Sequence, residues 1–102
     1  MPTPFLVPSP DRTAHRDWDP YTVHGANNIF RRHREDIIEM LEAIADEPRD
    51  RLFLATSPLR RKPWIAGAMV TLGLIVEKPS PNGACAVAMT PNGVAVLERN
   101  AA

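Results

Sequence analysis

The hydrophobic residues between positions 28 and 46 recur with the period of an α-helix. Ile29, Phe30, Ile37, Leu41 and Ile44 fall at helical spacing, so they can share one face of a helix. We therefore predict that the main core helix spans residues 28–46. Its basic residues come first and its acidic residues come last, opposite to the order that the helix dipole favours. This inversion indicates either an electrostatic role for the basic start or an ordinary solvated face.

Prolines divide the next part of the chain into short elements. Pro48 ends the core helix or begins the next one, and the hydrophobic residues of 49–56 fit a short second helix. Pro63 can occupy the first position of a third helix, where its missing N–H costs nothing. We predict that this third helix runs from residue 63 to about residue 72 and that Gly73 ends it. Its buried stripe is predicted to contain Trp64, Ala68, Met69 and Leu72.

Two Asn-Gly pairs mark the last third of the chain in different ways. Asn82-Gly83 lies between the apolar runs 74–76 and 86–89, which predicts a β-hairpin because glycine accepts a positive φ. Before the second pair, Thr90 can cap a helix with its hydroxyl and Pro91 can take the first helical position, so we predict a short terminal helix. The predicted order is helix, helix, helix, strand, strand, helix.

The first part of the chain is rich in proline and lacks a regular hydrophobic pattern. Four prolines among the first ten residues predict an extended arm, and we place a Pro-rich N-terminal arm at residues 1–27 and one folded domain at residues 28–102. A domain this small buries only about 60% of the surface that its unfolded chain exposes, so homodimerisation would add useful burial. Trp18 and Tyr21 are the candidate dimerisation residues, because their rings can cover the core or a partner subunit.

Charge is segregated along the chain although the formal net charge is zero. Residues 35–50 carry seven acidic residues and one arginine, whereas residues 51–79 carry five basic residues and one glutamate. Within the basic stretch, Arg60, Arg61 and Lys62 are consecutive and form a local positive cluster that suits a polyanionic partner. The alternative is that these three side chains are ordinary solvated surface residues without a binding role.

The remaining features argue against a membrane protein, a metalloprotein and an enzyme. Cys85 is the single cysteine, no secretory leader opens the chain and no apolar run reaches the roughly 20 residues of a membrane span, so we expect a cytoplasmic protein. His15, His24 and His33 lack partners at metal-ligand spacing, so we expect no metal and no cofactor. The acidic residues of 35–42 fit a solvated helix face, and no catalytic motif is found. We therefore expect no catalytic residues.

Three segments carry a resemblance to a known family. They are Ile37-Ile38-Glu39-Met40-Leu41 in the leading helix, Met69-Val70-Thr71-Leu72-Gly73-Leu74-Ile75-Val76-Glu77 before the hairpin, and Met89-Thr90-Pro91-Asn92-Gly93-Val94-Ala95-Val96-Leu97-Glu98 after it. In this order they resemble the winged helix-turn-helix domains of small bacterial and phage transcription regulators, notably those of the multiple-antibiotic-resistance type, over about residues 34–99. The resemblance implies an α+β, mainly α fold with a three-helix core, a two-stranded β-hairpin wing and a short C-terminal helix.

The same resemblance implies binding to double-stranded DNA, with the third helix in the major groove and the wing at the backbone or minor groove. We therefore expect a homodimeric transcription regulator. The alternative is a winged-helix module that binds a protein without binding DNA, and joint exposure of Ile65, Met69 and Val70 would favour it. Carried over by position, the residues implied to face DNA are Arg60, Arg61, Lys62 and Thr71 with the third helix, and Lys78, Ser80 and Asn82 in the wing.

Overall fold

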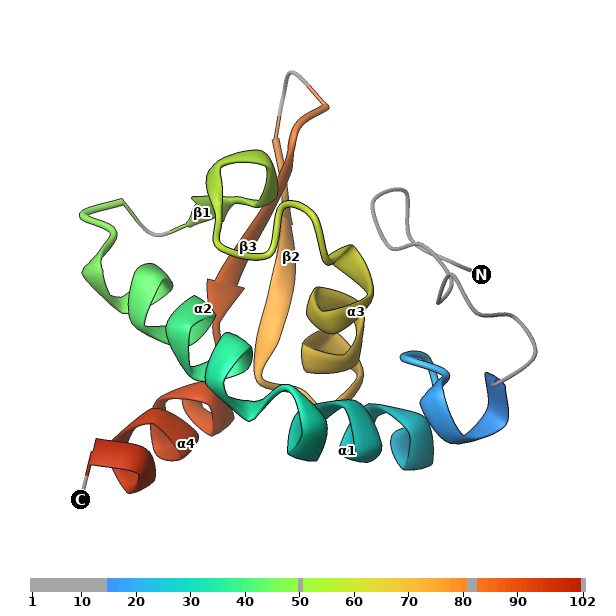
Figure 1. The fold of residues 1–102 in the computed structure, drawn as a ribbon. Coiled ribbons are helices and arrows are strands. Elements are labelled where there is room, and N and C mark those ends of the chain that lie inside the picture. The colour runs from blue at the N-terminus through green and yellow to red at the C-terminus, as the bar shows by residue number, and fades with distance from the viewer. Residues whose placement is uncertain (1–14, 50, 81–82, 102) are drawn as a thin grey trace.

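The computed structural model describes residues 15–49, 51–80 and 83–101 of the chain. In chain order, the elements are two short 3-10 helices, four α-helices and three strands within this part (Figure 1). They are η1 (His15–Trp18), α1 (Val23–Arg32), α2 (Arg34–Asp46), β1 (Leu52–Phe53), η2 (Leu54–Thr56), α3 (Pro63–Thr71), β2 (Ile75–Pro79), β3 (Cys85–Met89) and α4 (Pro91–Ala101).

The three strands form one antiparallel sheet in the order β1-β3-β2. Leu52 is paired with Val87, and Glu77 is paired with Val87 on its other side. Leu52, Ile75 and Val87 are buried members of the core, and they share the face that meets the helices because side chains of a strand alternate between its two faces. The predicted antiparallel hairpin is therefore present, and a third strand extends its sheet.

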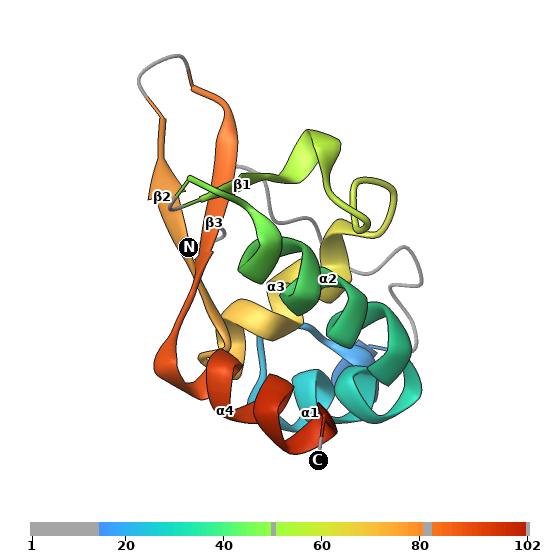
Figure 2. The same ribbon diagram turned by 90° about the vertical axis from the view of Figure 1, so that its left-hand side faces the viewer.

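The helices lie on one side of this sheet, as Figures 1 and 2 show together. Helices α2 and α3 lie beside the sheet, whereas α1 and α4 occupy one end of the molecule. The β2–β3 hairpin projects at the opposite end. The fold is thus mainly helical with a small sheet, as expected of an α+β domain.

The prediction of a single helix over residues 28–46 is wrong, because the chain bends at His33 between α1 and α2. Hydrogen bonding continues through the bend, since the His33 N–H donates to the Ile29 carbonyl and the His33 carbonyl accepts from the Ile37 N–H, at 2.8 and 3.0 Å. The bend lets Ile29 pack toward α3 while the stripe of α2 faces the sheet. One straight helix could not bury both stripes, so tertiary packing decides the break.

The bend also accounts for the charges on either side of His33. Arg31 and Arg32 lie in the last turn of α1, and Glu35 and Asp36 lie in the first turn of α2. Both placements agree with the helix dipole, which favours cations at a C-terminus and anions at an N-terminus. Helix α2 itself still begins with Arg34 and ends with Asp46, and its last turn holds no basic residue, so the acidic end of α2 remains unfavourable to its dipole.

The prediction of a short helix over residues 49–56 is also wrong. Leu52 and Phe53 form the edge strand β1 against Val87 and Ala86 of β3, and only residues 54–56 form a helical turn, of the 3-10 type. Leu52 is buried. Pairing with β3 satisfies backbone groups and buries Leu52, and this tertiary contact outweighs the weak local preference for helix.

The later elements confirm the predicted helix starts, helix end and turn. Helix α3 begins with Pro63, and Gly73 follows it with φ +74°. Gly83 has φ +82°, which glycine adopts without strain. Helix α4 begins at Pro91, and the Thr90 hydroxyl accepts from the N–H of residue 93 at 3.1 Å. Local turn and cap chemistry therefore predicted these boundaries well.

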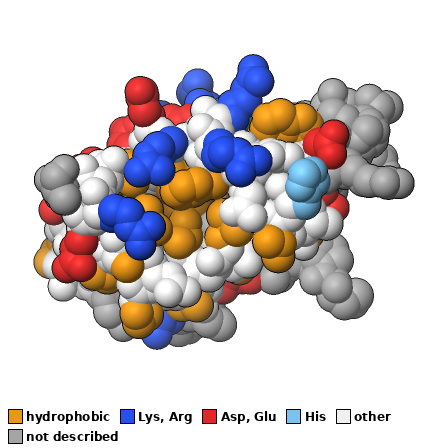
Figure 3. Space-filling model, turned by 90° about the horizontal axis from the view of Figure 1, so that it is seen from below, with side chains coloured by type: hydrophobic (Ala, Val, Ile, Leu, Met, Phe, Trp, Pro, Cys, Tyr) orange, Lys and Arg blue, Asp and Glu red, His pale blue; other side chains and the backbone are white. Residues whose placement is uncertain are grey.

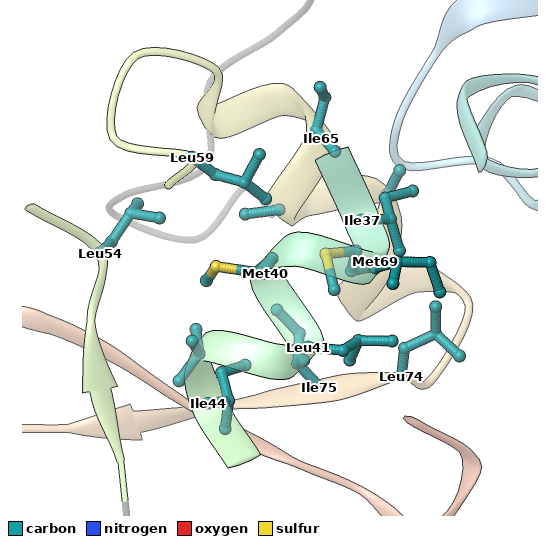
Figure 4. Packing of buried hydrophobic residues seen from close by; sticks show 14 of the residues in the cluster. Ile37, Met40, Leu41, Ile44, Leu54, Leu59, Ile65, Met69, Leu74 and Ile75 are labelled. Carbon is teal, nitrogen blue, oxygen red and sulfur yellow. The ribbon is translucent and has the colours of Figure 1, made fainter. Parts of the chain in front are cut away.

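The core joins α2, α3 and the sheet (Figure 4). Met40 and Leu41 of α2, Met69 of α3 and Ile75 of β2 are fully buried and lie among one another. Leu59 lies at the same core from the turn before α3, with 1% exposure. This contact fixes the turn that carries the predicted basic cluster, because burying a leucine stabilises its position by about 1.5–3 kcal/mol.

Candidate nucleic-acid interface

The predicted basic cluster lies in a turn that is anchored on both sides of Pro58. Ser57 is 1% exposed, and its hydroxyl donates to the Leu54 carbonyl at 2.8 Å and accepts from the Leu59 N–H at 3.2 Å. With Leu59 in the core, this segment is held on its inner side. The basic turn, defined as residues Arg60, Arg61 and Lys62, is exposed on the solvent side.

The three cations of the basic turn differ in their partners. The Lys62 ammonium lies 3.2 Å from an Asp36 carboxylate oxygen in the first turn of α2. Asp36 also lies 3.6 Å from Nδ1 of His33. Within the described part of the chain, Arg60 and Arg61 have no carboxylate partner. Their charges therefore remain for an anion in solution.

Helix α3 presents a different surface from the one implied for a base-reading helix. Ile65 and Met69 are fully buried and Val70 is half-buried, so no joint apolar patch of these three residues is exposed on this described helix. Thr71 is half-buried, and its hydroxyl contacts the Pro20 carbonyl as well as the carbonyl of residue 67, the latter at 3.0 Å. The structure therefore places Thr71 beneath the N-terminal segment, at the opposite end of α3 from the basic turn.

Of the three residues implied for the wing, Lys78 and Ser80 lie in the described part of the chain. Lys78 is half-buried on β2 and is paired in register with Ala86, and Ser80 is half-buried at the end of the strand. Asn82 lies outside the described residues. The hairpin and the segment before α3 both lie in the half of the molecule away from α1 and α4. The basic turn and Lys78 thus share this half.

The candidate dimerisation residues Trp18 and Tyr21 lie against their own chain. Trp18 packs against the core, with the Arg32 guanidinium 5.7 Å from its ring centroid. The Tyr21 N–H donates to the Asp19 carboxylate at 2.9 Å, and the Tyr21 hydroxyl is buried with no hydrogen-bond partner among the described residues. Trp18 therefore docks on the core of its own chain.

A second basic region, which the sequence pattern did not single out as a site, lies on α1. Figure 3 shows the end of the molecule that carries α1 and α4, where Lys and Arg side chains lie along part of the border of an exposed hydrophobic area. An open hollow in the described structure is lined by Arg31 and Arg32 together with Asp17, Trp18, His24 and Asn28. The adjacent arginines are visible in the sequence, but the hollow depends on η1 folding back along α1.

Two groups near Glu77 have altered acidity. Burial, with a smaller effect from the Glu77 carboxylate, raises the pKa of the Cys85 thiol. Burial also raises the pKa of the Tyr21 phenol, and Asp19 and Glu77 add to this rise. Both groups are therefore held in their neutral forms at neutral pH, which makes Cys85 a poor nucleophile.

The described residues contain no cluster of three or more His, Cys, Asp or Glu side chains arranged to hold a metal ion. None of their helices is both long enough and apolar enough to cross a membrane. Comparisons with known proteins give no match, whether to a family model, to a curated protein or to a solved structure. Function is therefore argued from the surface of this chain.

Proposed function

We propose that this chain is a small winged-helix protein that binds double-stranded DNA with the half of the molecule that carries the basic turn and the hairpin. The observation that carries the proposal is the anchored, exposed basic turn at the N-terminus of α3. Three consecutive cations directly precede the first N–H groups of α3. No acidic residue lies in the first turn of this helix. Such a site favours phosphate.

The arrangement of elements supports the winged-helix interpretation. A helix, a short edge strand, α3, a two-stranded hairpin and a closing helix follow one another, and the edge strand pairs with the second strand of the hairpin. The hairpin would act as the wing, with Lys78 near its outer part. A duplex lying across this half would meet the basic turn and the hairpin together.

Contacts to phosphate, rather than to bases, follow from the burial of α3. Every residue of α3 is buried or half-buried, so its side chains do not extend outward as major-groove reading requires. Arginines and a lysine at a helix start can bind the backbone without reading sequence. We therefore propose that this protein recognises the duplex through charge and shape, as an architectural or regulatory DNA-binding protein that acts as a homodimer.

A fluorescence-anisotropy titration with a labelled duplex at several salt concentrations tests the proposal. Replacing Arg60, Arg61 and Lys62 together by Ala should weaken binding to every duplex, and the slope of log affinity against log salt should fall by about 0.9 for each phosphate that is no longer bound. As a matched control, Arg61→Ala is compared with Arg99→Ala, since Arg99 is exposed in the last turn of α4. Absence of duplex binding by the wild type at low salt would overturn the proposal.

The second candidate is a protein-interaction module, and the surface of α1 and α4 favours it. Hydrophobic side chains gather beside basic ones on that face (Figure 3), and Val94 of α4 is 41% exposed. Exposed apolar patches of this kind mark interaction sites. If the wild type fails to bind DNA while Val94→Asp abolishes capture of an acidic protein partner, this second candidate replaces the first.

A further inference from the structure

We propose that the hollow between η1 and α1 is a binding site for an oxyanion, specifically the phosphate group of a phosphate ester. The hollow is shallow and wide open to solvent. It is lined by Arg31 and Arg32, by the ring of Trp18, and by Asp17, His24 and Asn28. This site is separate from the basic turn and does not depend on the proposed binding of DNA.

The guanidinium of Arg31 is held in place by a neutral group. Its Nη2 donates to Oδ1 of Asn28, and Nδ2 of Asn28 in turn donates to the Asp17 carbonyl at 2.7 Å. This chain of hydrogen bonds orients the guanidinium without neutralising it, because an amide oxygen carries no net charge. The remaining N–H groups of Arg31 are available in the planar arrangement that suits a phosphate.

The guanidinium of Arg32 is also held by a neutral group. It lies 5.7 Å from the centroid of the Trp18 ring, within cation–π range. Neither Arg31 nor Arg32 has a carboxylate partner among the described residues, whereas Lys62 pairs with Asp36. Orientation without neutralisation leaves both positive charges for a ligand.

The acidic group that lines the hollow pairs with a histidine and not with either arginine. An Asp17 carboxylate oxygen lies 3.2 Å from Nε2 of His24, and that nitrogen lies 3.4 Å from Nδ2 of Asn28. Asp17 is thus the partner of the imidazole, and α1 itself contains no acidic residue. The hollow carries a positive balance with two oriented guanidinium groups, which is the chemistry of an oxyanion site.

The aromatic ring distinguishes two sources of the phosphate. A phosphate on a small molecule with a flat base could place that base near Trp18, since ring faces stack on one another. A phosphate of a nucleic-acid backbone would instead bring the duplex to this end of the molecule. Both share one recognition chemistry, and titration with each ligand separates them.

The test follows the indole N–H signal of Trp18 by NMR, with Trp18→Phe used to assign it against Trp64. Inorganic phosphate, a nucleoside monophosphate and a short duplex are titrated at constant ionic strength. We expect a saturable shift with inorganic phosphate in the millimolar range. Arg31→Gln and Arg32→Gln should each weaken this binding by about tenfold, the loss expected for one charged hydrogen bond. The exposed Arg99→Gln, with the same charge change, should leave it unaltered.

Each further outcome decides the proposal or its ligand. Tighter binding of the nucleoside monophosphate than of inorganic phosphate supports the site and identifies a small phosphate ester, whereas competition by the duplex supports the site and identifies a backbone phosphate. No saturable shift, or an equal shift in Arg31→Gln and the wild type, overturns the proposal. The Trp18 signal reports phosphate binding in the hollow. The outcome of this test is therefore independent of duplex binding at the basic turn.

Discussion

The ammonium of Lys62 lies 3.2 Å from the carboxylate of Asp36, so the start of α3 is tied to the start of α2. The two residues are 26 positions apart in the chain. The contact has two effects: it orients the last cation of the basic turn, and it offsets part of its charge. Asp36 therefore lowers the positive potential at the surface that we propose for DNA.

Asp36→Asn should increase duplex affinity while slightly lowering stability. The substitution frees Lys62 for a phosphate, so the slope of log affinity against log salt should rise by up to about 0.9. The pair is partly exposed, so the loss in free energy of unfolding should be about 1 kcal/mol or less. Anisotropy titrations and urea unfolding measure the two effects.

Asp46→Asn is the matched control, because Asp46 is exposed at the far end of α2 and the charge change is the same. An equal rise in affinity for both variants would show that net charge, rather than the released Lys62, is responsible. Unchanged binding in Asp36→Asn would argue against phosphate binding by Lys62.

Gly25→Ala should be strongly destabilising although alanine favours helices. A Cβ at Gly25 would lie 2.2 Å from the Asp19 carbonyl oxygen, so the segment that follows η1 could no longer pack on α1. Overpacking of this kind costs about 1–3 kcal/mol. Gly83→Ala is the comparison: its Cβ would meet nothing within 4 Å, and only the positive φ should cost about 1 kcal/mol. Urea unfolding that shows Gly25→Ala as stable as the wild type would contradict this close approach of Asp19 to α1.

Tyr21→Phe should leave the protein as stable as the wild type at neutral pH, or more stable. The hydroxyl that it removes is buried without a hydrogen-bond partner among the described residues, and such a group costs free energy. Burial, Asp19 and Glu77 raise the pKa of the phenol in the folded state. Ionising the phenol is therefore harder in the folded protein than in the unfolded chain. The protein keeps its full stability below the pKa of the unfolded chain and loses stability as the pH rises through the raised folded value.

Denaturant unfolding across alkaline pH measures this effect. The wild type should lose stability as the pH rises through the range in which tyrosine ionises, and Tyr21→Phe should lose less. Cys85→Ser serves as a second comparison, because the raised pKa of the Cys85 thiol acts in the same direction. An identical alkaline decline in the wild type and Tyr21→Phe would exclude Tyr21 as a cause.

Homodimerisation should be visible by sedimentation and should depend on α4 or the N-terminal segment. Val94→Asp places a charge on the exposed face of α4 and should weaken association. Removal of residues 1–14 tests the N-terminal segment more cleanly than removal of residues 1–24, because Pro20 contacts Thr71 and Thr22 caps α1. A wild type that stays monomeric at high micromolar concentration would contradict the prediction.

Local chemistry in the sequence determined the boundaries in the second half of the chain. Pro63 and Pro91 begin helices, Thr90 caps one, and Gly73 and Gly83 take positive φ. Each depends on a residue and its immediate neighbours, so sequence patterns predict it. The basic turn was found in the same way, because its three cations are consecutive.

Tertiary packing decided where the long helical pattern breaks. The helical period continues from residue 28 to 46, but the need to bury Ile29 against α3 and Ile37 against the rest of the core breaks it at His33. The change from Arg31 and Arg32 to Glu35 and Asp36 was a local signal of that break.

Tertiary packing also decided the edge strand and the hollow. Leu52 and Phe53 became a strand because Val87 and Ala86, far later in the chain, offered a partner. The hollow on α1 exists because η1 folds back onto it. No local pattern encodes a contact between segments that only packing brings together.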